Sequence, residues 1–113
     1  MEIQKEQCAI KYIKERSEIL VSGSMRLLGA ENYNEISDVF TQAVEDEPKT
    51  LTLDITKLRF LNSSGINVFF KFLISLRKRN KTQLTILGTN DFFWQKKTLQ
   101  NFQKILPGTK LKI

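Results

Sequence analysis

The chain of 113 residues, 41% of them apolar, has the size and composition of one globular domain, which we expect to span residues 1–113. It has no histidine and one cysteine, Cys8, which excludes histidine-based acid–base chemistry, Ser-His and Cys-His nucleophile pairs, Cys/His zinc clusters and an internal disulfide. The net charge of +6 favours acidic partners, but the basic run 77–81 is better explained as cations at a helix end than as a nucleic-acid site.

The first part of the chain has the pattern of two strands and a helix. Loose alternation over residues 9–14, a polar break at 15–18 and alternating apolar residues over 19–25 predict a β-hairpin. Asn32 and Glu35 have the spacing of a capping box at the start of a helix. The apolar stripe of that helix is Tyr33, Ile36, Val39, Phe40, Ala43 and Val44.

Short strands and helices alternate in the rest of the chain. Residues 50–55 and 82–87 have the pattern of buried central strands, and a helix is predicted from residue 63 to about residue 80. A third helix ends at Pro107 and Gly108, and residues 109–113 can add a last strand. The predicted order is β-β-α-β-α-β-α-β, an α/β domain with a mixed sheet, right-handed crossovers and helices packed mainly on one face.

The second helix has an unusually wide apolar arc. The face expected to pack on the sheet consists of Ile66, Phe69, Phe70, Leu73 and Ile74. Val68, Phe72 and Leu76 lie on a flank beside that face. Either a neighbouring helix covers Val68 and Phe72, or they are partly exposed and mark a partner surface. We favour coverage, because burial is the default for large apolar side chains.

Two serines open this helix. A serine at a helix start can satisfy free backbone N–H groups, and a phosphate on its hydroxyl would be stabilised by the helix dipole. We interpret Ser64 as a structural cap, whereas Ser63 is either a cap or a phosphorylation site. Asp54 could orient the turn or contribute to a partner surface, but a hydrogen bond to nearby backbone is the simpler role.

An aromatic cluster at residues 92–94 lies outside the helical periodicity. Its members are Phe92, Phe93 and Trp94. Closure of one end of the core is the simpler interpretation, and an exposed cluster would instead indicate a second contact surface.

Residues 51–56, 58–61 and then Asn62, Ser63, Ser64, Gly65 and Ile66 at a helix start together resemble a STAS domain, the family of bacterial anti-sigma factor antagonists. The resemblance covers essentially the whole chain, and the Ser-Ser-Gly-Ile turn is its specific part. Residues 87–99 are also similar to a stand-alone cyanobacterial subgroup. Many antagonists have Asp at the position of Asn62, so this chain has one charge fewer beside the first serine.

The N-terminus lacks the pattern of a signal peptide and no apolar run is long enough to span a bilayer, so we expect a cytoplasmic protein with no membrane-inserted partner. No spacing of residues indicates a cofactor, a metal site or nucleic-acid binding. The resemblance implies a non-enzymatic phosphoprotein of signal transduction and transcription regulation. In antagonists a partner kinase of the GHKL type, here expected to be an anti-sigma factor or sensor kinase, phosphorylates the first serine, here Ser63, and a PP2C-type phosphatase reverses the reaction. The implied partner surface comprises Asn62, Ser63, Ser64, Gly65, Asn67, Val68, Lys71 and Phe72. The alternative is a constitutive STAS adaptor of a transport or signalling assembly, in which the same helix docks permanently and Ser63 is only a cap.

Overall fold

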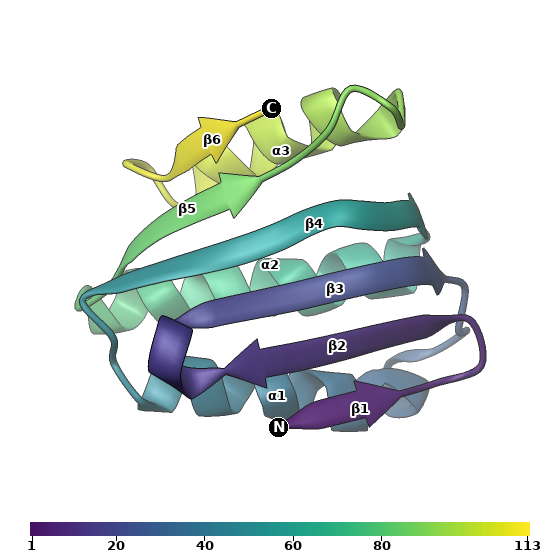
Figure 1. Cartoon of the computed structure of the whole chain (residues 1–113), viewed down its shortest axis with the longest axis horizontal. Helices are drawn as coiled ribbons and strands as arrows, with labels where there is room; N and C mark the ends of the chain where they lie inside the picture. Colours follow the sequence, from purple (N-terminus) through teal and green to yellow (C-terminus); the bar gives the residue numbers. More distant parts are fainter.

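A six-stranded mixed sheet carries three helices on one face in the computed structural model, which describes the whole chain from Met1 to Ile113 (Figure 1). The strands are β1 (Glu2–Gln4), β2 (Cys8–Ile13), β3 (Glu18–Met25), β4 (Thr50–Leu61), β5 (Gln83–Leu87) and β6 (Lys110–Lys112). The helices are α1 (Asn34–Glu45), α2 (Ser63–Arg79) and α3 (Trp94–Ile105), with short 3-10 turns η1 (Lys14–Arg16) and η2 (Ala30–Tyr33).

The strands follow one another across the sheet in chain order. β1, β2 and β3 pair antiparallel, whereas β3, β4, β5 and β6 pair parallel through crossovers that contain α1, α2 and α3. The predicted α/β class, the mixed sheet and the helices on one face are therefore confirmed. The structure adds β1, a three-residue edge strand too short to show periodicity in the sequence.

The core lies between the sheet and the helices and contains 26 buried apolar residues. Phenylalanine rings join the three helices to one another. Phe40 of α1 lies 4.6 Å from Phe72 of α2 between ring centroids, and Phe69 of α2 stacks on Phe102 of α3 at 5.5 Å. Because such pairs add to the burial of large apolar area, they fix how the helices lie against each other.

The buried face of α2 differs from the expected one. Val68, Phe72 and Leu76 are buried, so the interpretation that a neighbouring helix covers Val68 and Phe72 is confirmed. Of the five residues assigned to the sheet-facing side, Phe69 and Leu73 are fully buried, which confirms that part of the assignment. Ile66, Phe70 and Ile74 are only half-buried, and Phe70 packs against Phe102 of α3, so that part was wrong. The reason is that α1 packs on one flank of α2, and this contact rotates the most buried line of side chains toward α1.

The capping box predicted at Asn32 is absent. Residues 30–33 form η2, and α1 begins at Asn34 without a side-chain cap. The Asn32 amide donates to the Leu28 carbonyl, and Glu35 forms an exposed ion pair with Lys5. Both side chains therefore bind other groups, and neither caps α1.

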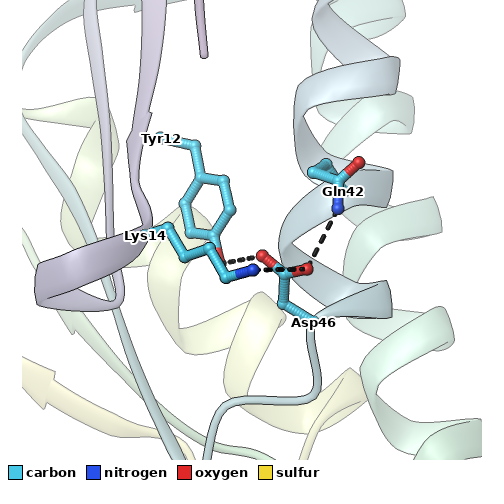
Figure 2. Close-up of polar contacts among 4 residues, drawn as sticks. All are labelled: Tyr12, Lys14, Gln42 and Asp46. Atoms are coloured by element: carbon cyan, nitrogen blue, oxygen red, sulfur yellow. Dashed lines mark hydrogen bonds and ion pairs between the residues drawn. The ribbon is translucent and has the colours of Figure 1, made fainter.

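The acidic end of α1 is held by a contact with β2. The Tyr12 hydroxyl donates to Asp46 at 2.7 Å, Gln42 donates to the other carboxylate oxygen at 3.0 Å, and Lys14 lies 3.8 Å away (Figure 2). The Tyr12 hydrogen bond in particular, with Gln42 and Lys14, holds the pKa of Asp46 below its usual range. A carboxylate that a helix C-terminus disfavours is thus compensated by the sheet.

β4 is one continuous strand of 12 residues, longer than the predicted segment 50–55. Its pairing with β3 shifts register between Leu20 and Ser22. Asp54 lies in the middle of β4, where its carboxylate accepts from the Thr56 N–H at 2.9 Å and from the Thr56 hydroxyl. The hydrogen-bonding role predicted for Asp54 is confirmed, and its expected position beside the serine turn was wrong because β4 continues to Leu61.

Candidate functional site

The turn from β4 into α2, residues 62–65, follows the paired ends of β3 and β4, where Met25 lies beside Leu61, whereas β5 ends earlier along β4, with Leu87 beside Asp54 (Figure 1). We call it the α2 turn. Carboxyl ends of parallel strands commonly carry the functional residues of α/β proteins, because connections from several strands meet there. Here the connection after β3 is bonded to the α2 turn through Leu27 and Gly29, and the connection after β5 leads to Trp94, which donates to the Arg59 carbonyl of β4.

Asn62 is the N-cap of α2 and also ties the turn to the preceding connection. Its Oδ1 accepts from the Gly65 N–H at 2.9 Å and from the Tyr33 hydroxyl at 3.2 Å. Its Nδ2 donates to the Leu27 carbonyl at 2.9 Å. An aspartate could supply the acceptor but not the donor, so the asparagine has a structural role of its own.

The two serines have different surroundings. The Ser64 hydroxyl accepts from the Gly29 N–H at 3.3 Å, so this serine holds the connection between β3 and α1 rather than capping the helix. Ser63 is exposed, and its hydroxyl takes part in none of the side-chain hydrogen bonds of the protein. The predicted capping role of Ser64 was wrong, and a capping role for Ser63 is excluded, because Asn62 occupies the cap position.

Gly65 permits a close approach of α2 to the sheet. A Cβ at this position would lie 2.6 Å from Leu61 Cδ1 and 3.3 Å from Met25 Cβ. Of the other residues of the implied surface, Asn67 and Lys71 are exposed, whereas Gly65, Val68 and Phe72 are buried. The accessible part of that surface therefore consists of Asn62, Ser63, Ser64, Asn67 and Lys71.

A shallow groove of about 240 Å³ runs between α2 and the start of α1 beside these residues. Its α2 side includes Ser64, Asn67, Lys71 and the half-buried Phe70 and Ile74. The outer side of α2 next to Ser63 thus combines polar side chains with apolar ones that the sequence had assigned to the sheet. Such a mixed surface is typical of contacts between proteins.

The electrostatics of the α2 turn favour an added anion. The first turn of α2 contains no acidic residue, so nothing opposes the partial positive charge of the 17-residue helix. No group of three or more His, Cys, Asp or Glu residues is placed to hold a metal ion. No helix combines the length and apolar character needed to cross a membrane.

Two residues of α3 hold that helix on β4: Trp94 of the aromatic cluster and Gln95, which the sequence did not single out. Gln95 is fully buried, and its Nε2 donates to the carbonyls of Ile55 and Leu58 at 2.8 and 2.9 Å. The Trp94 indole N–H donates to the Arg59 carbonyl at 2.7 Å. The aromatic cluster is thus divided, since Trp94 is docked on β4 while Phe93 is 95% exposed. A glutamine in a helix carries no sequence signal of such burial.

Comparisons with known proteins agree with this geometry. The family model described as STAS domain matches residues 13–112. A chain in the crystal structure of the diguanylate cyclase SiaD in complex with its activator SiaC from Pseudomonas aeruginosa superposes with a TM-score of 0.77 at 16% identity, over 99% of this chain and 98% of that one.

The structure of SiaC of Pseudomonas aeruginosa superposes with a TM-score of 0.75 at 18% sequence identity, over 100% of this chain and 95% of that one. The structure of apo-SiaC from the same organism superposes with a TM-score of 0.75 at 16% sequence identity, over 100% of this chain and 98% of that one. At these identities the likeness establishes the fold. No curated protein matches the chain.

Proposed function

Because the chain belongs to the STAS domain family, we propose that it is a non-enzymatic regulatory domain that binds a protein partner through the α2 turn and the outer side of α2. A protein of the same fold, SiaC, is described as the activator of an enzyme with which it forms a complex. The accessible residues around Ser63 fit a binding role, since they are polar and half-buried apolar side chains without a metal-binding cluster.

We further propose that phosphorylation of Ser63 switches this binding. The observation that carries the proposal is that Ser63 begins α2 with an exposed, unbonded hydroxyl while Asn62 supplies the cap. A phosphate brings about 1.5 to 2 negative charges, and a helix start stabilises it. The fold should tolerate the modification, whereas an apolar or acidic partner surface would be repelled.

The proposed enzymes are a GHKL-type anti-sigma factor or sensor kinase that modifies Ser63 and a PP2C-type phosphatase that restores it, acting in the cytoplasm. Cys8 needs no redox role in this setting, since burial raises the pKa of its thiol and keeps it protonated. The second candidate is the constitutive adaptor, in which the same surface binds without modification. The two candidates differ in what a negative charge at Ser63 does.

Affinity capture from lysate of the source organism, followed by mass spectrometry and by titration of the purified partner, separates the two candidates. The baits are wild type, Ser63→Glu and Ser63→Ala, with Gln100→Glu as the charge control, because Gln100 is exposed on α3 and lies outside the proposed surface. We expect Ser63→Glu to lose a GHKL-type kinase, with about tenfold weaker affinity or more, while Ser63→Ala and Gln100→Glu retain it. Equal binding by all four proteins would reject the switch in favour of the adaptor.

Phosphorylation itself is tested by incubating wild type and Ser63→Ala with lysate and ATP. Intact mass and peptide mapping should find one phosphate on wild type at Ser63 and none on the variant. Modification of both proteins would place the phosphorylation site elsewhere.

A further inference from the structure

Two strongly exposed apolar side chains belong to the connections that reach the C-terminal part of β4, the strand that precedes Ser63. Leu28 is 78% exposed in the connection after β3, and Phe93 is 95% exposed in the connection after β5. β3 and β5 pair with β4 on opposite sides, so the connection after β3 lies on one side of β4 and the connection after β5 on the other. The first is bonded to Asn62, and the second leads to Trp94, which is bonded to Arg59. Arg59 and Asn62 are three residues apart, roughly 10 Å along a strand, a distance that one partner surface can cover.

Leu28 is held in its exposed position from both sides. The carbonyl of Leu27 accepts from Asn62 Nδ2 at 2.9 Å, and the N–H of Gly29 donates to the Ser64 hydroxyl at 3.3 Å. The residues before and after Leu28 are therefore bonded to the α2 turn, which leaves the leucine side chain pointing to solvent with little freedom in its backbone.

Phe93 has an equivalent arrangement on the other side. Trp94 donates to the Arg59 carbonyl, and Gln95 donates to two β4 carbonyls and accepts from the Thr89 N–H at 2.9 Å. The two residues after Phe93 are thus bonded to β4, and the chain before it is folded back by the Thr89 contact. Phe93 projects from a fixed point beside Arg59 of β4, on the β5 side of that strand, whereas Leu28 lies on the β3 side.

This placement differs from ordinary scattered exposure of apolar residues. Single exposed leucines and phenylalanines are common and need no explanation. Side chains that are fixed by hydrogen bonds on neighbouring residues lose less conformational entropy when a partner covers them, which is the property of binding anchors. Both such side chains lie at the end of the molecule that carries Ser63.

The charges around them indicate the chemistry of the partner. Exposed charged side chains in segments 26–32, 59–63 and 88–97 are Arg26, Arg59, Lys96 and Lys97 against Glu31 and Asp91. Arg26 stacks 4.0 Å over the ring of Phe60, which is itself 37% exposed. The surface is thus apolar at two fixed points and more basic than acidic between and around them, which complements an apolar patch with acidic side chains at its border.

We propose that Leu28 and Phe93 are the two apolar anchors of the partner interface, one on the β3 side and one on the β5 side of the C-terminal part of β4, and that the occupant is a protein surface with an apolar centre and an acidic rim. The proposal rests on the proposed binding function and extends it beyond α2 to the connections after β3 and β5. It also accounts for a switch at Ser63, because a phosphate on the turn that holds the Leu28 connection would face an acidic partner.

The test introduces the photo-reactive p-benzoylphenylalanine at position 28, at position 93 and, as control, at Gln100 on the exposed side of α3. After irradiation in lysate, the cross-linked partner peptide is sequenced, and that partner is purified for titration against Leu28→Asp, Phe93→Asp and Gln100→Asp. All three positions are exposed, so the thermal midpoint, measured alongside, should equal that of the wild type.

We expect positions 28 and 93 to cross-link one protein at an apolar segment flanked by acidic residues, and position 100 not to do so. Leu28→Asp and Phe93→Asp should each weaken binding of the purified partner about tenfold or more, and Gln100→Asp should not. Cross-links to a second copy of this chain, no cross-link above that of position 100, or Leu28- and Phe93-dependent sedimentation with phosphatidylserine vesicles would each overturn the proposal.

Repeating the cross-linking in the Ser63→Glu background separates this proposal from the switch. Unchanged cross-links with Ser63→Glu would leave the anchors standing and reject the switch. A partner whose capture depends on Ser63 but which tolerates both anchor substitutions would leave the switch standing and reject the anchors.

Discussion

Asn62→Asp tests whether the asparagine is a helix cap alone or also holds the connection that presents Leu28. The exchange replaces the Nδ2 donor by an oxygen and leaves the acceptor that binds Gly65 and Tyr33 in place. In the variant a carboxylate oxygen would face the Leu27 carbonyl, which Nδ2 now approaches at 2.9 Å. The cap should survive, and the tie to the connection should be lost.

The expected magnitude follows from these contacts. Loss of the hydrogen bond together with two acceptors left facing each other lowers the free energy of unfolding by about 1 to 2 kcal/mol. A negative charge at the start of α2 interacts favourably with the helix dipole and raises the free energy of unfolding by about 0.3 to 1 kcal/mol. We therefore expect Asn62→Asp to be less stable by about 1 kcal/mol, which for a domain of this size lowers the thermal midpoint by about 4 °C.

Urea unfolding measures the stability, and amide hydrogen exchange of Gly29 measures the local effect, since that N–H is held by Ser64 in the same connection. Asn62→Ala, which loses cap and donor together, should cost about 2 kcal/mol, and Ser63→Ala should be neutral. An Asn62→Asp variant with wild-type stability and unchanged Gly29 exchange would refute the tie and leave Asn62 as a cap only.

Three further substitutions test other parts of the fold. Gln95→Leu leaves two buried β4 carbonyls unpaired and should cost about 3 kcal/mol in urea unfolding; a cost below about 1 kcal/mol would show that water replaces the amide. Tyr12→Phe removes the bond that lowers the pKa of Asp46. A carboxylate whose pKa is lowered in the folded state stabilises the fold at pH values above its ordinary pKa, and this stabilisation is lost as the pH falls through the folded pKa. The difference in the free energy of unfolding between wild type and Tyr12→Phe should therefore be full at pH 7 and decline below about pH 4. A difference that does not change with pH would contradict this. Gly65→Ala should cost about 1 kcal/mol by thermal denaturation, because crowding against Leu61 outweighs the better helix propensity of alanine, and a more stable variant would show that the turn has room to spare.

The elements of the fold could be predicted because their signals are local. Strand alternation and helical stripes record which side of each segment is apolar, and this was enough for the order of strands and helices and for the mixed sheet. The start of α2 was also visible, since two serines directly precede the apolar run, although the cap itself is Asn62. β1 was missed because three residues carry no periodicity.

The candidate site could be located from the sequence but not assigned residue by residue. The pattern placed Ser63 and Ser64 at a helix start, whereas their roles depend on Asn62 taking the cap and on Gly29, 35 residues before Ser64, donating to its hydroxyl. The exposure of Leu28 and Phe93 has no sequence signal, because an apolar residue in a connection looks the same whether it is buried or exposed.

By itself, the sequence determined the class of fold, the position of the α2 turn and the absence of histidine chemistry, since these follow from composition and from interactions within a few residues. Only the tertiary structure decided which face of α2 is buried, which serine is free and which apolar side chains stand out beside it. The physical reason is that burial and hydrogen bonding at the sheet edge join segments far apart in the chain. Asn62 and Leu27, for example, are 35 residues apart and meet only when β3 and β4 pair.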